Sequence, residues 1–163
     1  MPKHLIGIMG PGDSASPLVA QTAYALGEAV AHRGWVLLTG GRNVGVMEAA
    51  SQGARAAGGL TVGILPSTDV STLSAAVDVP ILTDLGNARN NVNVLSSEVV
   101  IACGIGLGTV AEVALALKAG KPVIFMRVPP EVVSFFEKLS LQTLMATDSV
   151  KTAIAWVEQQ LGL

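Results

Sequence analysis

The chain has 163 residues, of which 50% are hydrophobic and 13% charged, and its formal net charge at pH 7 is −2. This length and hydrophobic content suffice for a packed core, argue against disorder, and fit one domain over residues 1–163. The slightly negative charge disfavours a nucleic-acid-binding protein, because such proteins need a basic surface to neutralise phosphates.

The use of cysteine and the N-terminal segment predict where the protein resides. Cys103 is the one cysteine, so the chain has no disulfide framework, and a reducing cytoplasm is the natural compartment. We expect Cys103 itself to be an inert core thiol. The segment 1–7 runs straight into a strand-like pattern without an apolar signal. No apolar run approaches the ~18 residues that a membrane span needs, so we expect no membrane contact.

Short apolar runs alternate with longer helical patterns, which is typical of parallel βαβ units. We therefore predict an α/β fold with a Rossmann-like, doubly wound, mainly parallel sheet flanked by helices. The predicted strands are Leu5–Met9, Trp35–Thr39, Leu60–Leu65, Val79–Leu82, Glu98–Cys103, Pro122–Met126 and Thr143–Ala146. The predicted helices run from Ser16-Pro17 to about His32, Val44–Ala57, Asn87–Leu95, Thr109–Ala119, Pro130–Leu139, and from a cap at Asp148 to about Leu161.

Two segments depart from this regular alternation. The segment Pro66–Ala76 fits neither pattern, and we interpret it as a loop over the ligand site. The helical stretch Val110–Ala119 has almost no polar face, so it should be buried nearly all round. One side can pack on the sheet, and we expect the other to pack on a second subunit in a homodimer or homotetramer.

Three glycine-containing turns follow predicted strands: Gly10-Pro11-Gly12, Gly40-Gly41-Arg42 and Gly104-Ile105-Gly106-Leu107-Gly108-Thr109. The carboxyl ends of parallel strands meet at one edge of a sheet, so these loops should form one ligand site. Glycine lets the backbone approach a ligand closely, and the helix N-terminus behind such a loop offers N–H groups and a positive dipole end to an anion. For the third loop, a tight turn without a ligand is the alternative.

Several common sites do not match the sequence. The spacing of Gly7, Gly10 and Gly12 is not the dinucleotide fingerprint, and no ribose-binding acid follows ~20 residues later, which disfavours bound NAD. His4 and His32 lie far apart and no second cysteine is present, so we expect no protein-ligated metal. The chain also has no G-x-S-x-G nucleophile elbow.

Polar residues near the loops are candidates for ligand contacts. Arg42 follows the second loop and Arg89 begins a predicted helix, and arginine offers a rigid fork to a phosphate. Either arginine could instead lie solvated on the surface. Asn90, with Asn91 and Asn93, lies on the same helix as a candidate ligand contact, cap or surface residue.

Glu112 is the candidate general acid or base of the region. The spacing Thr109-x-x-Glu112 is also that of a capping box, in which both side chains satisfy the first backbone donors of a helix and no catalysis is needed. Both interpretations stay open. Asp13 and Ser14 beside the first loop, and Glu48 near the start of the second helix, are further candidates.

The order of these motifs resembles a known family. Thr39-Gly40-Gly41-Arg42, Gly45-Val46-Met47, Ala57-Gly58-Gly59 and Gly63-Ile64-Leu65-Pro66 resemble the proteins once described as possible lysine decarboxylases. That family includes the cytokinin-activating (LONELY GUY) phosphoribohydrolases. The third loop resembles their P-G-G-x-G-T-x-x-E motif, with Gly106, Gly108, Thr109 and Glu112 in register. The resemblance covers roughly residues 4–126.

Within that family the chain is more similar to the molybdenum cofactor carrier proteins of algae and cyanobacteria. The similar segments are Met9–Gly12, Trp35–Arg42, Val77–Ile81, Gly86–Asn90 and Ala111–Lys118. The resemblance implies a Rossmann-like subunit, assembly into dimers or tetramers, and a pocket that holds the phosphate of molybdopterin.

Two departures from the hydrolase pattern favour binding over turnover. The hydrolases carry Glu-Arg where this chain has Ala88-Arg89, and P-G-G where it has Gly104-Ile105-Gly106. Isoleucine does not readily take the positive φ open to glycine, so the loop should have another shape. N-glycosidic hydrolysis needs positioned carboxylates, and one of them is missing.

The first functional hypothesis is therefore a non-catalytic carrier of molybdenum cofactor. Loop 104–109 would hold the phosphate, Arg42 and Arg89 would balance its charge, and the cargo would pass to molybdoenzymes or come from cofactor-synthesis proteins. The alternative is a phosphoribohydrolase that cleaves the N-glycosidic bond of nucleoside 5′-monophosphates, with Arg89 orienting the ligand and Glu112 as acid–base residue. A nucleotide sensor or another small-ligand binder is a third hypothesis.

Overall fold

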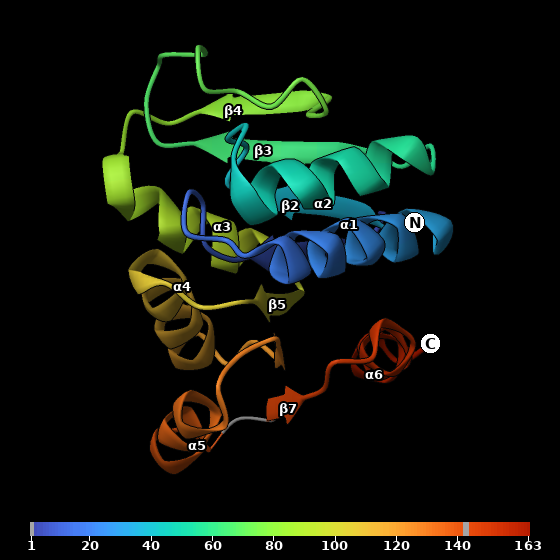
Figure 1. Ribbon diagram of the computed structural model, residues 1–163, viewed down its shortest axis with the longest axis vertical. Coiled ribbons are helices and arrows are strands. Elements are labelled where there is room, and N and C mark those ends of the chain that lie inside the picture. Colours follow the sequence, from blue (N-terminus) through green and yellow to red (C-terminus); the bar gives the residue numbers. More distant parts are fainter. Residues whose placement is uncertain (1, 142–143) are drawn as a thin grey trace.

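The computed structural model describes residues 2–141 and 144–163. In this part of the chain seven parallel strands form one sheet in the order β4-β3-β2-β1-β5-β6-β7, which Figure 1 shows from β4 at the top to β7 near the bottom. The predicted parallel α/β sheet is therefore confirmed. The strands are β1 (Leu5–Met9), β2 (Val36–Thr39), β3 (Thr61–Leu65), β4 (Val79–Leu82), β5 (Val99–Cys103), β6 (Val123–Met126) and β7 (Leu144–Ala146).

The helices cover both faces of the sheet. One face carries α1 (Pro17–His32), α2 (Gly45–Ala56) and α6 (Val150–Leu161), which bury a common apolar cluster with the strands. The other face carries α3 (Arg89–Ser96), α4 (Leu107–Lys118) and α5 (Pro130–Leu139), which form a second cluster. A 3₁₀ turn (Gly86–Ala88) leads into α3. This three-layer arrangement is the doubly wound fold expected from alternating strands and helices.

The core follows from the alternation of side chains along the central strands. Ile6 and Ile8 of β1 point to the layer of α1, α2 and α6, whereas Met9 points to the layer of α3, α4 and α5. Every residue of β5 is buried, as both neighbouring strands and both helix layers cover it. Such double burial explains why the strands read as continuous apolar runs.

The order of the strands reverses between β1 and β5, which are neighbours in the sheet although three strands separate them in sequence. At such a switch point the chain leaves adjacent strands in opposite directions, and a crevice opens beyond their carboxyl ends. The loops after β1 and β5 flank this crevice, and the loop after β2 lies beside them. The topology thus brings together the three glycine-containing turns.

Several predicted helix starts are wrong. The third helix begins at Arg89, after the 3₁₀ turn, and not at Asn87. The fourth helix begins at Leu107, with Gly106 as its N-cap residue, and not at Thr109. The last helix is capped by Ser149, whose Oγ accepts a hydrogen bond from Thr152 N. Asp148 has another role, since its carboxylate accepts from Arg127 N and pairs with the Arg127 guanidinium. A serine and an aspartate cap equally well, so sequence alone does not choose between neighbours.

The predicted environment of the fourth helix is confirmed on one side only. Val113 and Ala116 of α4 are fully buried against the sheet, whereas Ala111 and Ala114 are exposed. The exposed side is the one that we expect to face a second subunit.

Thr143, the predicted first residue of the last strand, lies outside the described residues. No helix in the described part of the chain is long and apolar enough to cross a membrane.

Candidate functional site

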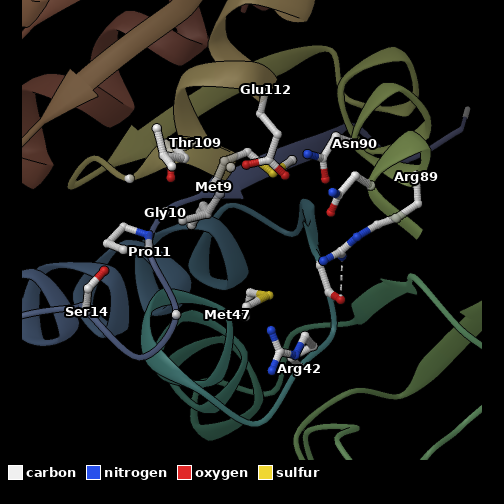
Figure 2. Close-up of a pocket in the computed structure, with 17 residues that line it drawn as sticks. Met9, Gly10, Pro11, Ser14, Arg42, Met47, Arg89, Asn90, Thr109 and Glu112 are labelled. Atoms are coloured by element: carbon white, nitrogen blue, oxygen red, sulfur yellow. Dashed lines mark hydrogen bonds between the residues drawn. The ribbon is translucent and has the colours of Figure 1, made fainter. Parts of the chain in front are cut away.

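A cavity of about 290 Å³ lies at the carboxyl ends of β1, β2 and β5 (Figure 2). Its size is near the lower end of the about 300–1,000 Å³ that is usual for small-molecule sites. The predicted residues that line it are Gly10, Pro11, Gly12, Gly40, Arg42, Arg89, Asn90, Gly106, Leu107, Gly108, Thr109 and Glu112. Residues from all three glycine loops therefore meet around one cavity.

Three predicted site residues lie outside this lining. Gly41 lies within the second loop at a φ of +77°, Gly104 begins the third loop at a φ of +74°, and Ile105 follows it. Both glycines turn the chain, and Arg42 and Gly106 beyond them line the cavity. Ile105 has no positive φ, as expected for a β-branched residue.

The N-terminus of α4 forms one wall of the cavity. The first hydrogen bond within the helix runs from Val110 N to Gly106 O, so the N–H groups of residues 107–109 precede it. The Gly106 N-cap supplies no side-chain oxygen to them. Because unsatisfied N–H groups and the positive dipole end lie together at a helix N-terminus, this wall suits an anion.

Thr109, on the same first turn of α4, adds a hydroxyl group to this wall. Thr109 is 2% exposed, and its Oγ1 is buried without a hydrogen-bond partner among the described residues. In Figure 2 this oxygen points into the cavity. The predicted capping box of Thr109 and Glu112 is wrong, because the helix begins two residues earlier and Thr109 is its third residue. An unpartnered hydroxyl here is available to a ligand.

Glu112 enters the cavity from one turn further along α4. Its side chain points into the cavity in Figure 2, and Oε1 accepts a hydrogen bond of 3.2 Å from Asn93 Nδ2 of α3. Burial raises the pKa of Glu112 to about 7, against the opposing effects of the Asn93 hydrogen bond and the charge of Arg89. Glu112 therefore changes its charge near neutral pH, where it can either accept or donate a proton.

Arg89 is held by the ends of two strands. Its Nη1 donates to Gly40 O at 2.7 Å and to Ile64 O at 2.6 Å. A Cβ atom on Gly40 would collide with the same nitrogen, which explains the glycine at that position. Burial lowers the pKa of Arg89, Glu112 opposes this shift, and Arg42 adds to it. Arg89 is thus a fixed positive charge in the wall, with only its remaining N–H groups free for a ligand.

Arg42 enters the cavity from the side opposite Glu112 in Figure 2. Among the described residues its guanidinium has no hydrogen-bond or ion-pair partner, so the whole fork is available to a ligand.

Four residues that line the cavity were not predicted from the sequence as site residues: Ile8, Met9, Met47 and Asn87. The signal that could have found them is their position, at the end of β1, in the first turn of α2 and just before α3.

Some of the remaining polar candidates line the cavity and others do not. Ser14 lines the cavity, whereas Asp13 and Glu48 line a separate hollow beside it. Asn91 is exposed on α3, and Asn93 is fully buried behind Glu112. Cys103 is buried, and burial raises the pKa of its thiol to about 12, which confirms an inert core position.

The segment Pro66–Ala76 does not lie over the cavity, and none of its residues lines it. Backbone hydrogen bonds from Asn43 N to Thr72 O and from Ser74 N to Gly41 O fasten it beneath the second loop. The backbone of Leu73 also forms an isolated bridge with Arg42. The segment therefore supports the loop that carries Arg42, which its irregular sequence could not reveal.

The described residues contain no group of three or more histidine, cysteine, aspartate or glutamate side chains placed to hold a metal ion. The chemistry that the site does offer is anion binding at α4 and Arg42, beside a carboxyl group that titrates near neutral pH. This combination fits a phosphorylated small molecule.

Two solved structures are similar to the chain over nearly its whole length. The molybdenum cofactor binding protein from the phototrophic bacterium Rippkaea orientalis is 55% identical with a TM-score of 0.96, and the match covers 99% of each chain. The molybdenum cofactor carrier protein from Chlamydomonas reinhardtii is 48% identical with a TM-score of 0.94, over 99% of this chain and 100% of that one.

A more distant relative is an enzyme. The cytokinin riboside 5′-monophosphate phosphoribohydrolase of Mycobacterium tuberculosis is 38% identical over 104 residues, which are 61% of this chain and 56% of the relative. The family model described as the SLOG cluster4 family matches residues 3–154. The chain therefore belongs to the SLOG cluster4 family, and it shares a family with the two molybdenum cofactor proteins to which it is similar.

Proposed function

We propose that the protein binds, protects and carries molybdenum cofactor without catalysis. The observation that carries this proposal is the wall made by the N-terminus of α4, where the N–H groups of residues 107–109 and the buried, unpartnered hydroxyl of Thr109 belong to the same helix turn. Such a wall fits the phosphate of molybdopterin. Likeness to two molybdenum cofactor proteins over nearly the whole chain supports the same ligand.

We assign the parts of the site as follows. The phosphate would lie against residues 106–109, and the free guanidinium of Arg42 would balance its charge from the opposite side. The loop Gly10–Gly12 and the side chain of Asn90 would enclose the pterin. The dithiolene of the cofactor binds the metal, so this assignment requires no metal ligand from the protein.

The same site differs from that of a hydrolase in one carboxylate. Ala88 stands where the phosphoribohydrolases have glutamate. Among the lining residues of this cavity, Glu112 alone carries a carboxylate. Activation of water and stabilisation of an oxocarbenium-like transition state usually need two carboxyl groups. This departure favours binding over turnover.

A phosphoribohydrolase acting on nucleoside 5′-monophosphates is the second candidate function. Glu112, with a pKa of about 7, shares the cavity with Arg89, and a general acid–base residue works best with a pKa near the operating pH. In that case Glu112 would be the acid–base residue and Arg89 would orient the ligand.

The deciding experiment is a titration of the purified protein with molybdenum cofactor under anoxic conditions, followed by separation of bound from free cofactor. Saturable retention near one cofactor per subunit, undiminished by excess AMP, is expected. Retention no higher than that of an unrelated protein would overturn the carrier, and base release from AMP would then be measured. Glu112→Ala separates the two functions, because it should abolish hydrolysis but leave retention of the cofactor measurable.

Thr109→Val tests the phosphate position directly. The substitution keeps the volume of the side chain but removes its buried, unpartnered hydroxyl, so we expect the Kd for the cofactor to rise about tenfold, the effect of one hydrogen bond to a charged group. Thr152→Val is the matched control, because Thr152 is exposed on α6. Equal affinities of the two variants would place the phosphate elsewhere.

The oligomeric state, the cellular location and the transfer of the cofactor are parts of the same proposal. Exposed alanines on α4 support a homodimer or homotetramer. The lone reduced thiol supports a cytoplasmic location. Delivery to molybdoenzymes, or receipt from cofactor-synthesis proteins, follows from a carrier's role.

A further inference from the structure

Asn93 is a fully buried polar residue that does not line the cavity but touches a residue that does. It lies in the middle of α3, is 0% exposed, and donates from Nδ2 to Oε1 of Glu112. Its Oδ1 is buried without a partner among the described residues. A buried amide usually satisfies both of its ends, so the orientation of Asn93 serves Glu112 at the expense of its own carbonyl oxygen.

The charge of Glu112 matters to any anion in the cavity. Glu112 follows Thr109 by one turn of α4, and both line the same cavity. An ionised carboxylate there repels a bound phosphate, because like charges interact strongly where water is largely excluded. A protonated carboxyl group instead donates a hydrogen bond to it. Binding of the anion and protonation of Glu112 are therefore coupled.

The charged groups that face Glu112 can be named element by element. Arg89 of α3 and Arg42 of the loop after β2 are the other ionisable residues that line the cavity, and both are positive. The neighbouring β1 and α2 contribute Met9 and Met47, which carry no charge. Two opposing effects thus act on Glu112: burial favours its neutral form, and Arg89 together with Asn93 favours its ionised form.

We propose that Asn93 is a positioning residue that sets the charge of Glu112 and thereby sets the pH at which the protein loses its phosphorylated ligand. This inference rests on the proposed function, because it requires an anion at the N-terminus of α4. The Nδ2–H group of Asn93 stabilises the ionised form of Glu112 and so lowers the pH at which Glu112 loses its proton. The native protein therefore holds its ligand below neutral pH and loses affinity above it. The lining residues stay the same, and only the proton on Glu112 changes.

The test compares retention of molybdenum cofactor by Asn93→Leu and the native protein between about pH 7 and pH 9, where a phosphate monoester with a pKa near 6 keeps its charge. Without the Asn93 donor, Glu112 keeps its proton to higher pH. The fall in affinity should therefore shift upward by about one pH unit, the effect of a hydrogen bond to a charged group. At the alkaline end Asn93→Leu should bind several-fold more tightly than the native protein.

Two further variants make the outcome decisive. Asn91→Leu is the matched control, because Asn91 is exposed on the same helix, and its pH profile should equal that of the native protein. Asn93→Asp keeps the volume of the side chain should the leucine variant fold poorly, and its negative charge shifts the profile in the same direction. A merely structural role of Asn93 would weaken retention equally at every pH.

The two proposals fail in different ways. Cofactor retention by the native protein with unshifted profiles for Asn93→Leu and Asn93→Asp overturns this inference and leaves the carrier intact. No retention at any pH overturns the carrier itself. Glu112→Gln adds an independent check, since a side chain that cannot ionise should give the same affinity at both ends of the range.

Discussion

Glu112 is 8% exposed, and burial raises the pKa of its carboxyl group from the ordinary 4.5 to about 7. In the window between these two values the folded protein keeps a proton that the unfolded chain has released. Stability is therefore complete below a pH of about 4.5 and falls as the pH rises through 7.

Glu112→Gln should remove this pH dependence of stability. The amide keeps the shape of the side chain and can still accept the hydrogen bond from Asn93. We expect the variant to be more stable than the native protein by about 1–3 kcal/mol at about pH 8, and similar near pH 4.5. Urea unfolding at both pH values measures the difference. A difference of the same size at both would mean that the ionisation of Glu112 is not its cause.

Single residues also show which contacts a sequence can predict. Glu112 stood out by its type and its place behind a glycine loop, and Arg89 by its type and its place at the start of a predicted helix. Their partners did not: Arg89 binds carbonyls 25 and 49 residues away, and Glu112 binds Asn93 across 19 residues. Such contacts depend on how α3 and α4 pack. A helix start displaced by two residues was enough to convert a predicted cap into an unpartnered hydroxyl.

Whole elements were predicted more accurately than their ends. The alternation of short apolar runs with helical patterns is a local property, and each predicted strand overlaps an observed one. The irregular segment 66–76 has no such local signal. Its position is fixed by backbone hydrogen bonds to residues 41–43, which a pattern of side chains does not encode.

The first loop and α2 are interlocked at Gly45. Val46 N donates to Pro11 O at 3.0 Å, and a Cβ atom on Gly45 would collide with the carbonyl oxygens of Pro11 and Gly12. Gly45 also has a φ of +56°, which favours glycine. The absence of a side chain at Gly45 therefore allows the first loop of the cavity to pack closely against the start of α2.

Gly45→Ala should destabilise the protein more than Gly58→Ala. Both residues have a positive φ, but a Cβ atom on Gly58 would meet nothing within 4 Å among the described residues, so its substitution tests backbone strain alone. We expect about 1–2 kcal/mol for Gly58→Ala and clearly more for Gly45→Ala, which adds the collision. Thermal unfolding measures both, and cofactor retention should fall only for Gly45→Ala. Equal losses of stability would show that the loop moves aside without cost.

At the scale of the whole molecule, the sheet determines where the site lies. The reversal of strand order between β1 and β5 gathers three loops that are separated by up to about 90 residues of sequence at one crevice. The parallel sheet and its glycine loops could be predicted from the sequence, and this was sufficient to locate the site. The shape of the cavity could not, because it depends on the tilt of α3 and α4 against the sheet.

Several apolar residues are exposed on α3, α4 and the edge strand β4. Ala111 and Ala114 of α4 are exposed, Leu95 of α3 is 52% exposed, and every residue of β4 is exposed, including Val79 and Ile81. The two helices pack against each other, so their outer sides form adjoining surfaces. Exposed apolar residues on the outer side of α4 are where we expect the second subunit of the proposed homo-oligomer.

Ala114→Glu tests the predicted homodimer or homotetramer. A charge placed on the outer side of α4 would be buried without a partner in such an interface, at a cost of several kcal/mol, so the variant should be a smaller assembly than the native protein. Ala155→Glu is the matched control, because Ala155 is an exposed alanine on α6 at the other face of the sheet. Size-exclusion chromatography with light scattering gives the mass of each. A native protein and both variants of equal mass would place the subunit contact away from α4, and a monomeric native protein would remove it altogether.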